Sequence, residues 1–214
     1  MGVTPEKLAE VYPRLYHMAE ANTWNSIQSL GLLSTSELLT RFGVTGARRQ
    51  EIETKRRATS VQITHEKLGR AIIRDQKPLI ESKLVTTLRG CSPEEWYRLL
   101  NGHVFFWLTT ERLEKLLCAE AYRAEEHTVL TIDTRSLISA YEPEATLTPM
   151  NTGNTQPFAH PRGPDKFMNL RDYPFDERAK YGRQNQVVEV AIKRGVPDIK
   201  KYVISAETRK CART

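Results

Sequence analysis

A short strand that leads directly into a capped helix constrains the fold of this chain most. The stretch Leu15–Met18 has the apolar and aromatic character of a strand. Asn22 or Thr23 can cap the helix that follows, because a side-chain oxygen accepts the free N–H groups of the first turn. Gly31 is placed to end that helix. Large apolar residues recur at helical spacing and give the helix one apolar face: Trp24, Ile27 and Leu30.

His17 lies near the end of this strand, where the strand turns into the helix. A polar ring at the mouth of a strand–helix unit can hold a ligand. The alternative is a surface histidine, or one whose hydrogen bonds are satisfied within the fold.

A second strand, Gln186–Ile192, carries a carboxylate among apolar neighbours. A nearly continuous apolar strand is typically covered on both faces. A buried carboxylate costs free energy unless it is paired or lies at a cleft. Glu189 shares a face of the strand with Val187 and the small Ala191, which would leave space for a ligand. The alternative is an edge strand whose glutamate lies in water.

The remaining pattern predicts an α+β protein that forms one domain over residues 1–214. There is no βαβ repeat and no glycine-rich phosphate loop. A helical insertion is expected over about residues 34–100, and a long basic loop rich in proline and glycine over about residues 151–185. Further strands are expected at four places: His103–Leu108, His127–Asp133, Thr146–Pro149 and Tyr202–Ala206.

Composition narrows the class of protein further. The hydrophobic content of 39% and the charged content of 27% are ordinary for a soluble globular protein. No apolar run approaches the ~20 residues that a membrane-spanning helix needs. The three cysteines, Cys91, Cys118 and Cys211, are widely spaced and predict neither a disulfide framework nor a metal pair. We therefore expect a protein of the reducing cytoplasm with no metal and no membrane partner.

Positive charge is concentrated in the chain and favours polyanions as partners. The formal net charge is +6. Arg48, Arg49, Lys55, Arg56 and Arg57 lie close together in the sequence. Arginine suits phosphate recognition, because its planar fork donates two parallel hydrogen bonds. The alternative is an exposed helix with ion pairs between residues four apart.

The strand–helix unit resembles the opening of ADP-ribosyltransferase-like proteins, most closely the nucleic-acid-modifying toxins of the DarT family. Those proteins begin with a hydrophobic-Tyr-His strand and a helix of the form N-L-x-x-I-L-x-x-G. The spacings from His17 to Ile27 and from His17 to Gly31 match this pattern. Ala19 stands where the toxins often carry a threonine, and Thr23 where they carry an asparagine. The chain also resembles an uncharacterised bacterial family of this length, through the strings IRDQKPL, EEWYRLLN and VFFWLT. That second resemblance implies no activity.

The resemblance implies a fold of two small sheets, flanked by helices, with NAD in the cleft between them. His17 is the matching position for a histidine that contacts a ribose of NAD. The toxins' catalytic glutamate lies in an A-E-V-L-V strand, which matches Val188–Ile192 and assigns that role to Glu189.

The resemblance gives more than one match for the toxins' catalytic arginine. Arg57 or Arg56 is the nearest match, and Arg74 is the rival; an arginine of this group would hold the pyrophosphate of NAD. The toxins' V-P-F-Y-F-x-P-R segment corresponds to Val104–Arg112, with Trp107 in place of their tyrosine. Trp107 or Phe106 could lie beside the cationic nicotinamide ring.

These residues imply an NAD-dependent transferase of ADP-ribose to a base of DNA or RNA, acting as a toxin or an anti-phage effector. Single-stranded nucleic acid and an antitoxin are the partners that this function implies. An RNA 2′-phosphotransferase is the alternative enzyme, although its family does not need the strand glutamate. A non-catalytic module that binds nucleic acid or protein on the same fold is the third possibility.

Overall fold

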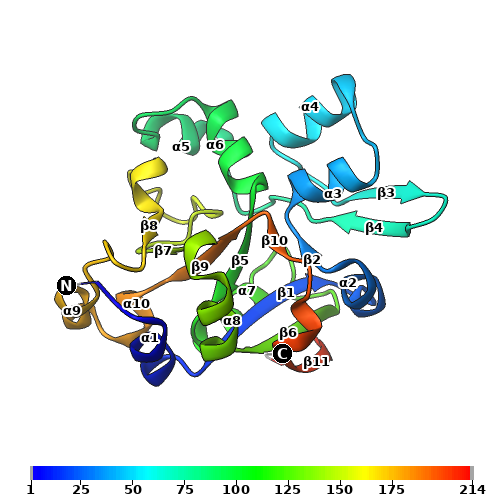
Figure 1. Cartoon of the computed structure of the whole chain (residues 1–214). Coiled ribbons are helices and arrows are strands. Elements are labelled where there is room, and N and C mark those ends of the chain that lie inside the picture. Colours follow the sequence, from blue (N-terminus) through cyan, green and yellow to red (C-terminus); the bar gives the residue numbers. More distant parts are fainter. Residues whose placement is uncertain (1, 213–214) are drawn as a thin grey trace.

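An antiparallel sheet of seven strands runs through the centre of the molecule (Figure 1). The structure is a computed structural model and describes residues 2–212. The strand order is β11-β6-β1-β5-β9-β7-β8. In chain order the strands are β1 (Arg14–Glu20), β5 (His103–Trp107), β6 (His127–Asp133), β7 (Ala145–Thr148), β8 (Met168–Asn169), β9 (Glu189–Lys193) and β11 (Val203–Arg209). The expected α+β class is confirmed.

The sheet is weakly joined at its middle. β1 pairs with β6 along its whole length, from Arg14 to Glu20. On its other side β1 shares one register pair with β5, Tyr16 opposite Trp107. The expected pair of separate small sheets is therefore wrong, because this one pair joins a three-stranded half to a four-stranded half. Beyond it the two strands separate.

Helices cover both faces of the sheet. α1 (Pro5–Val11) and α8 (Thr134–Tyr141) pack on one face, where Leu8, Leu137 and Ile138 join the largest core cluster. α7 (Thr110–Leu117) packs on the other face through Leu113 and Leu117. The predicted helix after β1 is α2 (Trp24–Leu30). Two short helices follow in the long loop, α9 (Phe175–Arg178) and α10 (Arg183–Gln186).

The predicted strand–helix unit is confirmed, with one difference at its cap. Gly31 ends α2 with a φ of +92°, and a Cβ at this position would meet the backbone of Pro197 at 2.5 Å. Thr23 precedes α2 but makes no side-chain capping bond. Its hydroxyl instead donates to the carbonyl of Glu20 at 2.6 Å, which ties the helix start to the end of β1.

Residues 34–100, called the insertion below, contain a hairpin as well as helices. In Figure 1 its four helices lie above the sheet, and the hairpin projects to the side. The helices are α3 (Thr35–Arg41), α4 (Gly46–Thr54), α5 (Glu81–Thr87) and α6 (Pro93–Asn101); the hairpin is β3 (Val61–His65) with β4 (Gly69–Ile73). A short ribbon of β2 (Leu32–Leu33) and β10 (Gly195–Val196) lies where the insertion begins.

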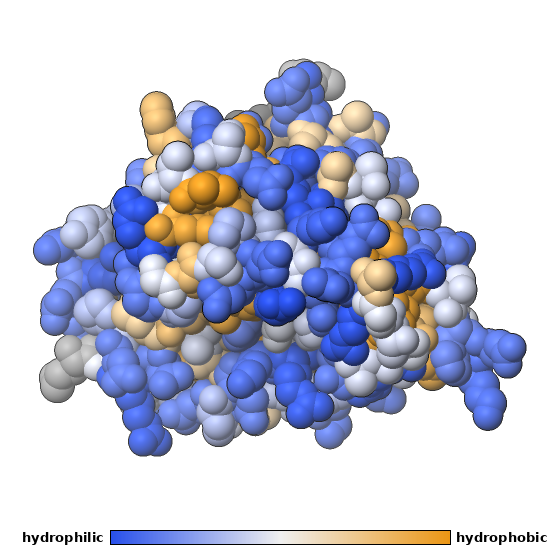
Figure 2. Space-filling view, turned by 90° about the horizontal axis from the view of Figure 1, so that it is seen from above, coloured by the Kyte–Doolittle hydropathy of each residue, from blue (hydrophilic) through white to orange (hydrophobic). Residues whose placement is uncertain are grey.

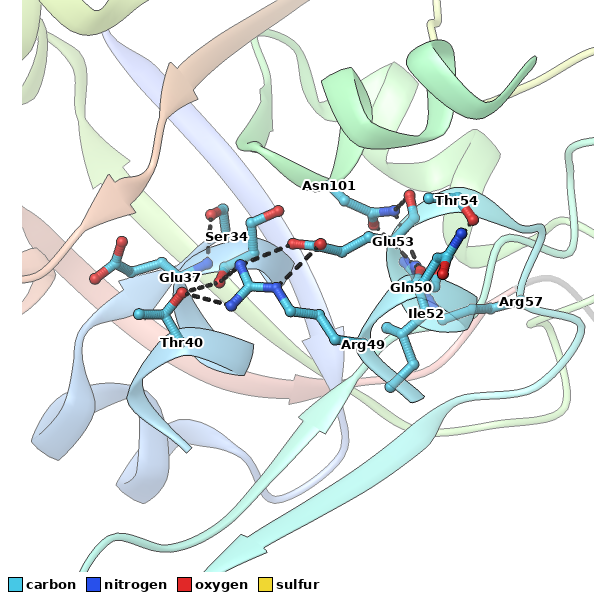
Figure 3. A network of polar contacts seen from close by, with 11 residues as sticks. Ser34, Glu37, Thr40, Arg49, Gln50, Ile52, Glu53, Thr54, Arg57 and Asn101 are labelled. Carbon is cyan, nitrogen blue, oxygen red and sulfur yellow. Dashed lines mark hydrogen bonds and ion pairs between the residues drawn. The ribbon is translucent and has the colours of Figure 1, made fainter. Parts of the chain in front are cut away.

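Arginines of the basic segment hold this insertion together (Figure 3). Arg49 pairs with Glu53 at 3.1 Å, four residues on, and also donates to Thr40 on α3. Arg57 is buried and donates to the carbonyls of Ile52 and Arg74 and to Oδ1 of Asn101, at 2.7, 3.0 and 2.8 Å. The ion-pair interpretation of the segment therefore holds for Arg49, and Arg57 joins α4 to α6.

A disulfide between Cys118 and Cys211 corrects the prediction from cysteine spacing. The two residues are 93 positions apart, so their spacing carries no signal. The fold brings them together because β11 pairs with β6 beside α7, and Arg209 on β11 forms an ion pair with Glu114 on α7. Cys91 is free. The cysteines therefore no longer support the expectation of a reducing compartment.

None of the described helices is long and apolar enough to cross a membrane.

The buried contacts of Arg57 predict a large stability effect. Arg57→Met keeps the side-chain length but leaves the Arg74 carbonyl and the Asn101 amide oxygen without this donor, and leaves the buried Ile52 carbonyl with a longer bond, 3.4 Å from Nδ2 of Asn101. We expect the free energy of unfolding in urea to fall by about 2–4 kcal/mol. Arg48→Met is the matched control, because Arg48 is exposed and makes one long contact, 3.5 Å to the carbonyl of Gln62. Equal effects of the two substitutions would contradict the structural role of Arg57.

Candidate functional site

A cleft of about 1050 Å³ lies between the sheet and the insertion. Its walls come from β1, α2, the segment after β4, β5, the start of β9 and the loop after β7. Figure 2 views the molecule from the side that carries the insertion, and shows two separate apolar patches within a mainly hydrophilic surface. The volume is at the upper end of the range for small-molecule sites and suits an extended ligand.

His17 fills the opening between β1 and β5. Its Nδ1 lies 2.8 Å from the carbonyl oxygen of Phe105. A carbonyl can only accept, so Nδ1 carries the proton and Nε2 carries a lone pair. Burial lowers the pKa of His17 to about 4, against the smaller opposing effect of the bond to Phe105, and the Arg74 cation lowers it further. At neutral pH the ring is therefore an uncharged acceptor that lines the cleft.

Arg74 lies across the same opening. Its Nη1 donates to the carbonyl of Met18 on β1 at 2.6 Å, and its guanidinium stacks 4.5 Å from the ring centre of Tyr122. The Tyr122 hydroxyl donates to Asp75 at 2.6 Å, which fixes the ring. Nη2 of Arg74 is buried and has no hydrogen-bond acceptor among residues 2–212. A buried cationic donor without an acceptor is a ready partner for an anionic ligand.

Glu189 is buried at the first residue of β9, with 3% of its surface exposed. The sequence placed it in the middle of the strand, but residues 186–188 lie outside β9. Its Oε2 lies within hydrogen-bond distance of three donors: the N–H of Thr152 at 3.1 Å, Oγ1 of Thr152 at 2.8 Å and Oγ1 of Thr148 at 3.2 Å. The Thr148 hydroxyl shares its one proton with the carbonyl of Met150 at 2.8 Å. In the part of the chain that the structure describes, Oε1 has no donor.

Burial raises the pKa of Glu189 to about 7, although the threonine hydrogen bonds and the Arg112 cation act in the opposite direction. The burial that raises the pKa outweighs three donors and a cation, as expected for a carboxylate removed from water. At neutral pH this carboxyl group is poised between its charged and neutral forms. Such a group can accept or donate a proton at little cost.

Trp107 connects the two halves of the site. It is the register partner of Glu189 on one side and of Tyr16 on the other. Strands in a sheet lie about 4.8 Å apart, so the backbones at Tyr16 and Glu189 are about 10 Å apart across β5. Successive side chains of a strand point to opposite faces, so His17 leaves β1 on the face opposite Tyr16, and its ring lies 5.7 Å from that of Phe106. Both His17 and Glu189 line the cleft, as does Trp107.

The structure brings five of the seven predicted site residues to the cleft: His17, Arg57, Arg74, Trp107 and Glu189. Arg57 borders it, but its Nε and Nη1 are already used within the insertion. Arg56 does not line the cleft and donates to the carbonyls of Leu79 and Lys77. Phe106 is also absent from the lining, because it points into the core on the opposite face of the sheet.

Sequence reasoning missed four residues around Glu189, one of which is Thr148, its register partner on β7. Thr152 supplies two of its hydrogen bonds, and Arg112 and Arg162 are the cations whose charges interact with it. Arg112 lies on α7 and Arg162 in the long loop, so neither has a fixed sequence spacing to Glu189. A surplus of arginine and threonine in a loop is not a distinctive signal, and only the fold reveals these contacts.

The profile of a family described as a family of unknown function (DUF7002) matches residues 13–203. Neither the curated proteins nor the solved structures gave a significant match. The matched range includes β1, the insertion, the whole cleft and β9.

Glu189 and His17 contribute to stability with opposite dependence on pH. The folded state keeps a proton on Glu189 up to about pH 7 instead of 4.5, so this contribution is lost as the pH rises through that window. The folded state keeps His17 neutral down to about pH 4 instead of 6.5, so that contribution is lost as the pH falls. In the unmodified protein the two changes in stability have opposite signs and largely offset each other between pH 4.5 and pH 6.5, where the two windows overlap.

Glu189→Gln should remove one of these contributions and expose the other. We predict that the unfolding free energy of the variant, relative to the unmodified protein, rises by about 3 kcal/mol between pH 4.5 and pH 7. The variant itself should lose stability on acidification, since His17 remains. Urea unfolding at several pH values measures both effects. Glu207→Gln, on the exposed face of β11, is the control. A difference for Glu189→Gln that does not vary with pH would contradict the raised pKa.

Proposed function

Since the chain belongs to the DUF7002 family, whose function is unknown, we propose an activity from the cleft itself: NAD-dependent transfer of ADP-ribose to a nucleic-acid base. One observation carries the proposal. His17 and Glu189, which come from sequence motifs at opposite ends of the chain, line one cleft from the two strands that flank β5. The motifs that support the resemblance to ADP-ribosyltransferases therefore share a site.

The cleft offers suitable partners for each part of NAD. Nε2 of His17, with its lone pair, can accept a hydrogen bond from a ribose hydroxyl. The free Nη2 of Arg74 can donate to the pyrophosphate, with the Lys77 ammonium also in the lining. The face of Trp107 suits the cationic nicotinamide ring. Arg74 therefore takes the role of the phosphate-binding arginine in preference to Arg56 and Arg57.

Glu189 would act on the bond between nicotinamide and ribose. As this C–N bond breaks, its electron pair leaves with neutral nicotinamide and positive charge develops on the ribose, as in glycoside hydrolysis. A carboxylate close to that charge stabilises it. The acceptor base then forms a new bond to the ribose carbon through a ring or exocyclic N–H. Oε1 of Glu189 can accept the proton that this nitrogen loses.

A nucleic-acid acceptor fits the surroundings of the cleft. Lys77, Lys115 and Arg112 line it, and the chain carries a net charge of +6. Phe158 also lines the cleft, with 77% of its surface exposed. An exposed aromatic ring among cations is a suitable surface for stacking a base beside its phosphates. Arg49, Arg56 and Arg57 are occupied within the insertion, so they contribute little to such a surface.

The proposal predicts that NAD binds and is cleaved. Millimolar NAD should raise the melting temperature, because a ligand that binds only the folded state stabilises it. His17→Ala should abolish the shift while the protein stays folded. Glu189→Gln should keep the shift but lower turnover by about 10²–10³-fold, since an amide offers no charge to the developing cation. Labelled NAD, incubated with separate pools of DNA, RNA and protein, measures turnover and identifies the acceptor.

Two results would contradict the proposal. One is the absence of any thermal shift with a folded sample. The other is turnover in Glu189→Gln equal to that of the unmodified protein. Glu207→Gln serves again as the control for removing a carboxylate far from the site.

A further inference from the structure

The two oxygens of the Glu189 carboxylate have different surroundings. Oε2 lies within hydrogen-bond distance of three donors, on Thr148 and Thr152, whereas Oε1 has none among residues 2–212. Thr148 is the register partner of Glu189 on β7, so its contact follows directly from the sheet. Thr152 belongs to the loop after β7, and the sheet does not fix its position. Its two contacts therefore need a separate restraint.

Arg162 supplies that restraint. Its side chain is almost fully buried, at 1% exposure, and Nη1 donates to the carbonyl of Thr152 at 3.1 Å. Its own backbone is fixed at both polar groups: the N–H donates to Thr87 at 2.9 Å, and the carbonyl accepts from Arg89 at 2.8 Å. Arg162 thus ties the Thr152 turn to the end of α5, and the N–H and hydroxyl of Thr152 are held toward Oε2.

We propose that Thr152, held by Arg162, is a positioning residue that fixes Oε2 of Glu189, leaves Oε1 as the reacting oxygen and favours the ionised form of the carboxyl group. The role in the reaction rests on the proposed function; the effect on ionisation does not. Two hydrogen bonds to the charged form favour that form. The charged groups that interact with Glu189 are Arg112 on α7 and Arg162 in the loop, and both cations act in the same direction as Thr152.

The threonine hydroxyl allows a substitution confined to one contact. Thr152→Val keeps the shape and the backbone N–H but removes the 2.8 Å bond from Oγ1. The ionised form of Glu189 then loses one of its three donors, so its apparent pKa should rise by about one unit. Thr152→Ser keeps the hydroxyl and should restore the original value. Thr155→Val is the matched control: Thr155 is fully buried in the same loop, but its hydroxyl contacts the Ile80 N–H and the Pro78 carbonyl.

The apparent pKa of Glu189 can be measured without any catalytic assay. The unfolding free energy of each variant is compared across pH with that of the same variant carrying Glu189→Gln, and the difference reports the titration of this one carboxyl group. We expect the curve for Thr152→Val to lie about one pH unit above those for the unmodified protein, Thr152→Ser and Thr155→Val. Coincident curves for Thr152→Val and the unmodified protein would overturn the inference.

Turnover then tests the role in the reaction. The acidic limb of the pH–rate profile should move to higher pH by the same amount in Thr152→Val, with about a tenfold loss at low pH and recovery at high pH. An equal loss at every pH would indicate a merely structural role and overturn the inference. A shifted pKa without NAD cleavage in any variant would leave the positioning of Glu189 intact and reject the proposed function. NAD cleavage by Thr152→Val with an unshifted pH–rate profile would support the proposed function and overturn the positioning role of Thr152.

Discussion

The interrupted ladder between β1 and β5 is the feature on which the site depends. One register pair joins the two strands, and two backbone carbonyls beside it, those of Met18 and Phe105, need other donors. Arg74 and His17 supply them with side-chain nitrogens. A buried carbonyl without a donor is costly, so these two side chains stabilise the opening while they line it. The hydrogen bonds that replace the ladder also fix the tautomer of His17 and the direction of Arg74.

A second consequence concerns charge. The cleft contains a neutral histidine, a carboxyl group poised near neutrality and an arginine with one donor free. Burial drives the first two away from their charged forms, because a charge loses its hydration in the interior. Arginine remains charged under the same conditions. Each of the first two groups therefore has an arginine near it: Arg74 beside His17, and Arg112 and Arg162 near Glu189.

The sequence predicted the parts of the fold that depend on local pattern. The β1–α2 unit, the glycine stop at Gly31 and the aromatic strand β5 follow from spacing and composition, and all are present. The seven-stranded sheet could not be foreseen, because one pair of residues, Tyr16 and Trp107, decides whether there is one sheet or two. The roles of neighbouring arginines were equally hidden. Arg56, Arg57 and Arg74 differ in which carbonyls lie within reach, and that is a property of the folded chain.

The disulfide between Cys118 and Cys211 divides the chain into a covalent ring and a linear arm. The ring spans 93 positions and carries Glu189, Thr152 and Arg162, whereas His17 and Arg74 lie on the arm. Closing a ring of this size removes enough freedom from the unfolded chain to favour folding by about 4–5 kcal/mol. A protease cut within the ring would release no fragment until the bond is reduced, whereas a cut between Arg74 and Cys118 would leave His17 and Arg74 with no peptide connection to the ring. In chain topology, the site is shared between a covalently closed loop and the open chain that leads into it.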